Sequence, residues 1–194
     1  MTQASQDPRL CRQRQKDSFN KKLVQIAAAG ATRAGAEVTL IDLKQFPLPM
    51  FDQDLEQANG VPEHAVRLKQ LFVEHDGLLI AAPEYNSSIT PLLKNSIDLV
   101  SRTTGDEPPL VAFQGKVTAP MSASPGELGG LRGLVHVRSI LGNIGVLVLP
   151  DQVAISKAFE AFGDNGQLLD ERKQAQVEKL GAELFRVITS LKGS

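Results

Sequence analysis

The sequence predicts an α/β fold, a doubly wound parallel sheet with helices on both faces. Short apolar runs alternate along the 194 residues with longer amphipathic stretches, a pattern typical of strands that alternate with helices. The sequence contains no repeat, no low-complexity tract and no linker. A chain of this length fits one domain, and strand–helix alternation implies right-handed crossovers between parallel strands.

Four apolar runs are predicted to be strands. The second is continuously apolar, as expected for a parallel strand that is covered on both faces. The third contains Pro120, which weakens it because proline has no N–H to donate to a ladder. The four predicted strands span residues 38–43, 77–82, 116–122 and 145–150.

Five amphipathic stretches are predicted to be helices. The first opens with Ser18, an N-cap residue type, and Pro62 and Pro91 suit the first turns of two others. The longest irregular stretches are 45–60 and 103–114. The predicted helices span residues 18–34, 62–75, 90–102, 129–141 and 170–191.

The bulk composition excludes several classes of function. The net charge is −1 and the basic residues are dispersed, so the sequence does not indicate the basic patch that nucleic-acid binding requires. No apolar run approaches the roughly 20 residues that span a bilayer. The single cysteine, Cys11, allows no internal disulfide, and the N-terminus lacks the apolar region of a secretory signal. We therefore expect a cytoplasmic protein that binds neither nucleic acid nor membrane.

Two loops that follow predicted strands are the candidate binding elements, because ligands of parallel sheets bind outside the carboxyl ends of the strands. The first contains Tyr85, the only tyrosine of the chain, which could flank a planar ring. Composition alone favours the alternative, a surface loop with one locally packed aromatic residue. The second contains Gly126, Gly129 and Gly130, which let backbone approach a ligand closely. The three histidines are scattered over predicted helices, so no metal site is expected.

Residues 82–98 resemble a long pattern, P-E-Y-N-x-S-x-P-x-x-L-K-N-x-I-D, of the NADPH-dependent FMN reductase family. This family includes quinone, azo-dye and chromate reductases of the flavodoxin superfamily. Residues 124–130 are similar to its S-x-G-x-x-G-G segment, and the likeness covers about residues 17 to 190.

The resemblance implies a flavodoxin-like fold, with five parallel strands in the order 2-1-3-4-5. It also implies an FMN-dependent oxidoreductase that takes hydride from NADPH or NADH. The reducing equivalents would pass by a ping-pong sequence to a quinone or a similar small electron acceptor. The flavin carries such chemistry, so no catalytic side chain is expected.

The resemblance also carries cofactor-binding roles to three short segments. They are the start of the first helix, the loop after the second predicted strand and the glycine loop. The residues concerned are Ser18, Asn20, Pro83, Glu84, Tyr85, Asn86, Ser124, Gly126, Glu127, Gly129 and Gly130.

The N-terminus departs from the family pattern, in which an apolar first strand leads into a phosphate loop, G-S-x-R-x-x-S-x-N. The last serine and asparagine match Ser18 and Asn20, but Arg12, Gln13 and Gln15 stand where the glycine, first serine and arginine belong. We therefore expect a degenerate segment, 1–16, before a flavodoxin-like domain, 17–194, with the first strand degenerate or missing. The departure predicts weak FMN binding, and it leaves open an alternative, a binding or scaffold protein that holds little flavin.

The predicted helix 90–102 is apolar around more than one face, which indicates a second surface that covers it. In the family this helix packs against its twofold mate. We therefore expect a homodimer or a tetramer assembled through this helix.

Overall fold

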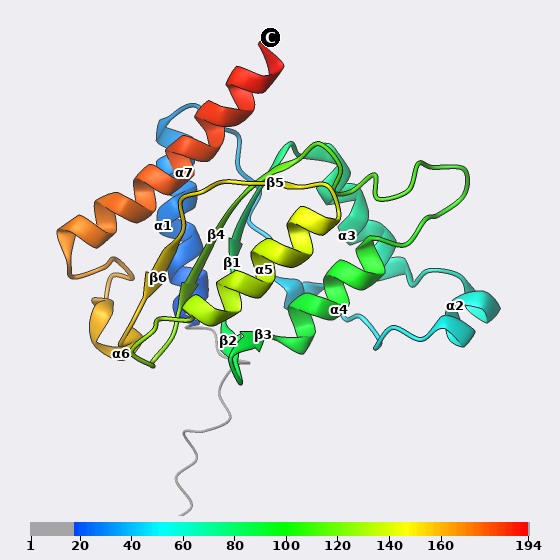
Figure 1. The fold of residues 1–194 in the computed structure, drawn as a ribbon, viewed down its shortest axis with the longest axis horizontal. Coiled ribbons are helices and arrows are strands. Elements are labelled where there is room, and N and C mark those ends of the chain that lie inside the picture. Colours follow the sequence, from blue (N-terminus) through cyan, green and yellow to red (C-terminus); the bar gives the residue numbers. More distant parts are fainter. Residues whose placement is uncertain (1–17, 194) are drawn as a thin grey trace, which may run out of the picture.

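A computed structural model describes residues 18–193, which form a parallel sheet with helices on both faces (Figure 1). The predicted N-terminal segment 1–16 lies outside the described residues. The central strand β4, Val117–Ala123, is buried along its whole length. It pairs in parallel with β1, Gly77–Ala81, on one edge and with β5, Leu147–Val148, and β6, Val153–Ile155, on the other. The predicted α/β class and its parallel sheet are confirmed.

The helices form two layers. Helices α1, Phe19–Arg33, and α7, Glu171–Lys192, cover one face of the sheet, and Figure 1 shows them side by side. Helices α3, Glu63–Glu74, α4, Pro91–Val100, and α5, Leu131–Asn143, lie on the other face. Each layer has its own apolar core against the sheet. All five predicted helices are confirmed to within two residues at each end.

Two glycines let α1 and α7 cross in backbone contact. A Cβ at Gly30 would lie 2.0 Å from the carbonyl oxygen of Glu178, and one at Gly181 would lie 1.9 Å from that of Ala27. No other residue type fits at either position without separating the helices. Helix α1 is therefore constrained by its backbone contact with α7 as well as by its apolar face.

The outer edge of β4 changes register by two residues at Pro120. Thr118 pairs with Val148, but Met121 pairs with Val153. By the alternation of the ladder, Pro120 would direct its missing N–H to this edge, so the slip falls where no hydrogen bond can form. The predicted strand 145–150 is therefore shorter than expected, and the sequence analysis missed β6.

The predicted strand 38–43 is wrong. The segment runs extended but forms no ladder with any described residue, and Leu40 is 55% exposed. Asp42 instead caps the short 3₁₀ helix η2, Leu43–Gln45. A branched, apolar composition predicts a strand only where a neighbour offers hydrogen bonds, and none lies beside this segment within residues 18–193.

The predicted order 2-1-3-4-5 is therefore present only in its 3-4-5 part, as β1, β4 and the interrupted strand β5/β6. The position of the first strand lies outside the described residues. Three further elements were not predicted. They are α2, Gln53–Asn59, inside the stretch 45–60; the hairpin of β2, Glu84–Tyr85, and β3, Ser88–Ile89; and α6, Ala158–Ala161.

A cavity of about 1380 Å³ runs beside β1. Within the described residues, β1 has a hydrogen-bonded partner on one edge only, and the cavity lies along the other. Its walls come from β1, the extended segment 36–44, helices α1 and α7, and helices α3 and α4. No helix of residues 18–193 is long and apolar enough to cross a membrane.

An apolar strand placed before α1 should stabilise the fold. We expect a chimera in which residues 1–15 are replaced by an apolar strand and the family's glycine-serine-x-arginine loop to melt several degrees higher. Such a strand could pair with β1 and fill the part of the cavity that runs beside it, and each kcal/mol is worth about 2–4 °C in a domain of this size. Calorimetry gives the melting temperature. A replacement of equal length made of serine and asparagine is the control, and equal melting of the two chimeras would contradict the prediction.

Candidate functional site

Three segments far apart in the sequence meet at the carboxyl end of the sheet (Figure 1). They are the start of α1, the β2–β3 hairpin that follows β1, and the loop 124–130 that follows β4. The carboxyl ends of parallel strands are where ligands of such sheets bind. The structure therefore brings the three predicted cofactor-binding segments to one end of the molecule.

Asn20 fixes the start of α1 to the end of β4. Its amide Nδ2 donates to the carbonyl oxygen of Ala123 over 2.8 Å, and the N–H of Ala123 donates to its Oδ1 over 3.0 Å. The side chain is buried. Both ends of its amide are thus used inside the protein, which makes Asn20 an anchor for the loops around it.

Ser18 is the N-cap residue of α1, and its hydroxyl makes no capping hydrogen bond. The first amide groups of a helix have no intrahelical partner and carry partial positive charge. Ser18 and Asn20 line the large cavity beside β1. The helix start therefore offers that cavity a hydroxyl, amide donors and a favourable field for an anion.

The β2–β3 hairpin turns tightly at two non-glycine residues with left-handed backbone. Asn86 has φ 48° and Ser87 has φ 66°, the conformation of a two-residue hairpin turn. Tyr85 stands just before the turn with 37% of its surface exposed. Tyr85 and Pro83 line the same cavity as the helix start, so four of the predicted residues share one cavity.

Glu84 faces away from the cavity, toward α5. Its Oε1 accepts from Arg132 Nη2 at 2.7 Å and from Nε at 3.0 Å, and its Oε2 accepts from the N–H of Gly133 at 3.0 Å. The side chain is only 8% exposed. Burial acts to raise the pKa of Glu84, but the hydrogen bonds from Gly133 and Arg132 outweigh it and lower that pKa below its usual value of 4.5.

The loop 124–130 folds over the ends of β4 and β6. Ser124 Oγ accepts from the N–H of Gly126 at 3.3 Å, and exposed Glu127 forms an ion pair of 3.3 Å with Lys157. A Cβ at Gly126 would meet only Ser124 Oγ, at 3.8 Å. The backbone at Gly126 is therefore open, and its predicted role in cofactor binding stays a prediction.

Gly129 and Gly130 are glycines for another reason. Both have positive φ, 61° and 92°. A Cβ at Gly129 would lie 2.7 Å from the backbone of Ile155, and one at Gly130 would lie 1.9 Å from Ser122 Oγ. Packing against the strand ends, rather than room for a ligand, explains both residues.

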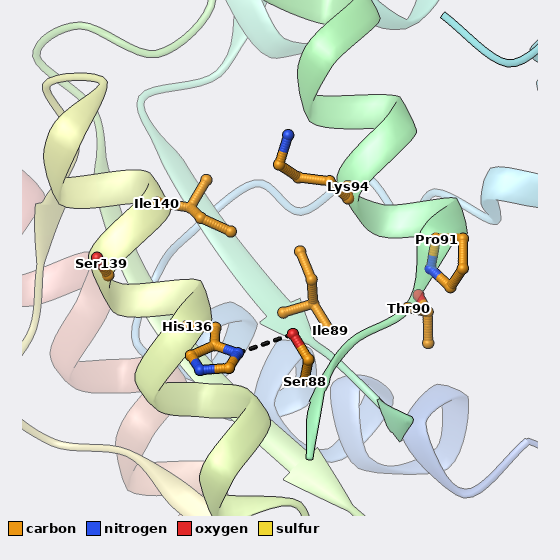
Figure 2. A pocket seen from close by; sticks show the side chains of 8 residues that line it. All are labelled: Ser88, Ile89, Thr90, Pro91, Lys94, His136, Ser139 and Ile140. Atoms are coloured by element: carbon orange, nitrogen blue, oxygen red, sulfur yellow. Dashed lines mark hydrogen bonds between the residues drawn. The ribbon is translucent and has the colours of Figure 1, made fainter. Parts of the chain in front are cut away.

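Sequence reasoning missed the residues of α5 that contact the hairpin. His136 Nδ1 is hydrogen bonded to Ser88 Oγ at 2.7 Å, and Figure 2 shows the two side chains pointing toward one another in the lining of a cavity of about 380 Å³. Arg132 and His136 lie four residues apart, on one face of the helix. That spacing, directly after the glycine loop, is the signal that could have identified them. Within residues 18–193, no group of three or more His, Cys, Asp or Glu side chains could hold a metal ion.

Comparison with known proteins gives three findings. The sequence profile described as NADPH-dependent FMN reductase matches residues 10–160. An NAD(P)H-dependent FMN reductase of Pseudomonas aeruginosa is 34% identical over 177 residues, which cover 91% of each chain. A quinone reductase of Pseudomonas putida is 33% identical over 172 residues, which cover 86% of this chain and 88% of the relative.

Solved structures show the same likeness. The flavoenzyme FerB, an NAD(P)H:(acceptor) oxidoreductase from Paracoccus denitrificans, superposes with a TM-score of 0.75 and 28% identity, over 91% of this chain and 92% of its own. A flavodoxin from the domain Archaea superposes with a TM-score of 0.58 over 90% of this chain and 94% of its own. Its 9% identity shows the fold alone, and that fold is flavodoxin-like.

The contacts of Glu84 should make stability depend on pH. Because its folded pKa is lowered, its contribution is present at and above its usual pKa of 4.5 and is lost as the pH falls through the lowered value. We expect Glu84→Gln to cost about 1–2 kcal/mol at neutral pH, and the two unfolding curves to converge in acid. Urea titrations from pH 7 to pH 3 measure this difference.

Glu183→Gln is the matched control, because Glu183 also has an arginine partner and a lowered pKa, but its side chain is 28% exposed, against 8% for Glu84. It should cost less than Glu84→Gln. A constant difference between wild type and Glu84→Gln at every pH would contradict the role given to the carboxylate.

Proposed function

This chain belongs to the NADPH-dependent FMN reductase family, and we propose that it is an FMN-dependent NAD(P)H oxidoreductase that reduces quinones or similar small acceptors. The observation that carries the proposal is the family match across most of the chain, together with a cavity at the carboxyl end of the sheet. Ser18, Asn20, Pro83 and Tyr85 line that cavity. A single cysteine among 194 residues supports a cytoplasmic location for this enzyme.

The residues of the site fit FMN at both ends of that molecule. Pro83 and Tyr85, which line the cavity, would offer contacts to a flat ring system. The open backbone at Gly126 lies in the loop after β4, outside the lining of the cavity, and would have to contact the ring from there. The hydroxyl of Ser18 and the amide groups at the start of α1 suit a phosphate dianion. The cavity, at about 1380 Å³, exceeds the ~300–1,000 Å³ of ordinary small-molecule sites, because it continues along the edge of β1 that has no partner among the described residues.

The residues of the chain bind and orient in this proposal. Tyr85 and Pro83 flank the ring, while Asn20 and Glu84 hold the loops in place from behind. When bound, FMN would supply the redox chemistry, taking hydride from NADPH or NADH and passing reducing equivalents to the acceptor in a ping-pong sequence. The proposal assigns no proton transfer to a side chain of the site.

A second candidate function is a binding or scaffold protein that holds little flavin. The edge of β1 that has no partner within residues 18–193 favours it, because a cavity along the sheet gives the loops above it less support. On that ground we also propose weak FMN binding. The chimera with an apolar strand separates the two candidates, because restored support should raise FMN affinity only if the remaining site binds flavin.

We further propose a homodimer, or a tetramer, assembled through α4. Its Ile97, Leu99 and Val100 are buried within the protomer, but Leu92 is exposed. On the neighbouring α5, Leu131 and Val135 are exposed one turn apart. We propose that a second copy covers these three exposed apolar residues, of which Leu92 also lines the large cavity.

The dimer proposal predicts a dimer in sedimentation at micromolar concentration and a monomer for Val135→Asp. A charge at the centre of an apolar contact is costly to bury. Leu169→Asp is the control, since Leu169 is exposed on a different part of the molecule. Wild-type protein that sediments as a monomer would rule out this assembly.

Flavin uptake tests the enzyme proposal. We expect the protein to acquire flavin absorbance after incubation with excess FMN and removal of free flavin, and then to oxidise NADPH or NADH in the presence of quinones. Tyr85→Ala should weaken FMN binding about 5-fold, the loss of about 1 kcal/mol for an aromatic wall. Gly126→Val should also weaken it by closing the open backbone.

Gly142→Val is the control for the loop variant, because a Cβ there would meet nothing within 4 Å. Gly129→Val is unsuitable, since it clashes with Ile155 and tests folding. A wild-type protein that stays colourless would refute the enzyme proposal, and turnover against a panel of acceptors would define the substrate.

A further inference from the structure

We propose that α5 holds the β2–β3 hairpin in place through two polar ties, which makes Arg132 and His136 positioning residues for the flavin site. The first tie joins Glu84 to Arg132 and to the N–H of Gly133, and the second joins Ser88 to His136. The inference deepens the proposed function and rests on it for its effect on FMN.

The hairpin needs support from outside itself. Within residues 18–193, strands β2 and β3 pair only with each other and lie apart from the main sheet, and an isolated two-stranded hairpin is marginally stable at best. Its turn also holds Asn86 and Ser87 at positive φ, a conformation that non-glycine residues adopt at a cost. Some contact must therefore keep the hairpin in its observed position.

The first tie acts before the turn. Glu84 directly precedes Tyr85, and both of its carboxylate oxygens accept hydrogen bonds from the first turn of α5. A Cβ at Gly133 would lie 3.3 Å from the carbonyl oxygen of Ser88, so the helix backbone lies directly against the hairpin. A buried carboxylate with fully used oxygens resists displacement, because leaving it unpaired is costly.

The second tie acts after the turn. Ser88 follows the turn, and its Oγ is hydrogen bonded to His136 Nδ1 over 2.7 Å (Figure 2). His136 lies one turn beyond Arg132 on the same face of α5. Each strand of the hairpin thus has its own tie, and Tyr85 and Asn86 lie between the two.

The position of Tyr85 therefore depends on residues that do not line its cavity. An aromatic side chain that is already fixed beside the site binds a ligand better than a mobile one, because less conformational entropy is lost on binding. If either tie is broken, the hairpin can move and Tyr85 loses its fixed place beside the cavity.

The composition of the chain provides a direct probe. Tyr85 is the only tyrosine and the protein has no tryptophan, so tyrosine fluorescence reports on the hairpin alone, with no flavin present. Quenching of this fluorescence by acrylamide measures how far the ring is exposed to solvent.

The experiment compares R132A, S88A and H136A with wild type by acrylamide quenching, FMN titration and melting temperature. We expect stronger quenching and roughly 5-fold weaker FMN binding in each, about the factor for one lost hydrogen-bonded contact. R132K should restore part of both, because lysine keeps the charge but not the two-nitrogen contact. S139A and R186A are controls, since no hydrogen bond joins either residue to the hairpin within residues 18–193.

Wild-type quenching in both R132A and S88A would overturn the ties, whatever their melting temperatures. Stronger quenching with unchanged FMN affinity would overturn the positioning role. If wild-type protein takes up no FMN while the variants still show stronger quenching, the ties stand and the proposed function alone fails.

Discussion

The paired hydrogen bonds between the Asn20 amide and the backbone of Ala123 support the rest of the site. They join the first described residues of the chain to the end of the central strand, which lies about one hundred residues later. With α1 fixed there, Ser18 faces the cavity that Tyr85 and Pro83 also line. The arrangement uses an uncharged side chain, whose two ends match the two backbone groups without leaving a buried charge.

The sheet and the site depend on different parts of the chain. Strand β4 is buried throughout and is paired on both edges, whereas β1 is paired on one edge only within the described residues. The loop after β4 is packed tightly enough that Gly129 and Gly130 admit no side chain. The hairpin after β1 has no such support from the sheet and relies on α5. Of the two loops, therefore, the one after β4 is held by the packed core and the one after β1 is held by side-chain contacts.

The sequence predicted the features that depend on local pattern. Helices with a long apolar stripe, such as α7, were found to within two residues, and the loop around Tyr85 was recognised from its motif. The segment 38–43 failed because a strand is a property of a pair, and its branched residues have no described neighbour. Helix α2 was missed because none of its residues is buried, although Asp52 caps its start. The partners of Glu84 could not be predicted, since they depend on how α5 lies against the hairpin.

The contact between α1 and α7 at Gly30 and Gly181 prevents α1 from sliding along its axis. Each glycine seats the carbonyl of the facing helix where a Cβ would otherwise stand. If α1 slid along its own axis by one residue, Ala29 or Ala31 would take the place of Gly30 against Glu178 and the helices would have to part. The contact with α7 therefore fixes the position of Ser18 along the axis of α1. Any motion of the site must then come from its loops.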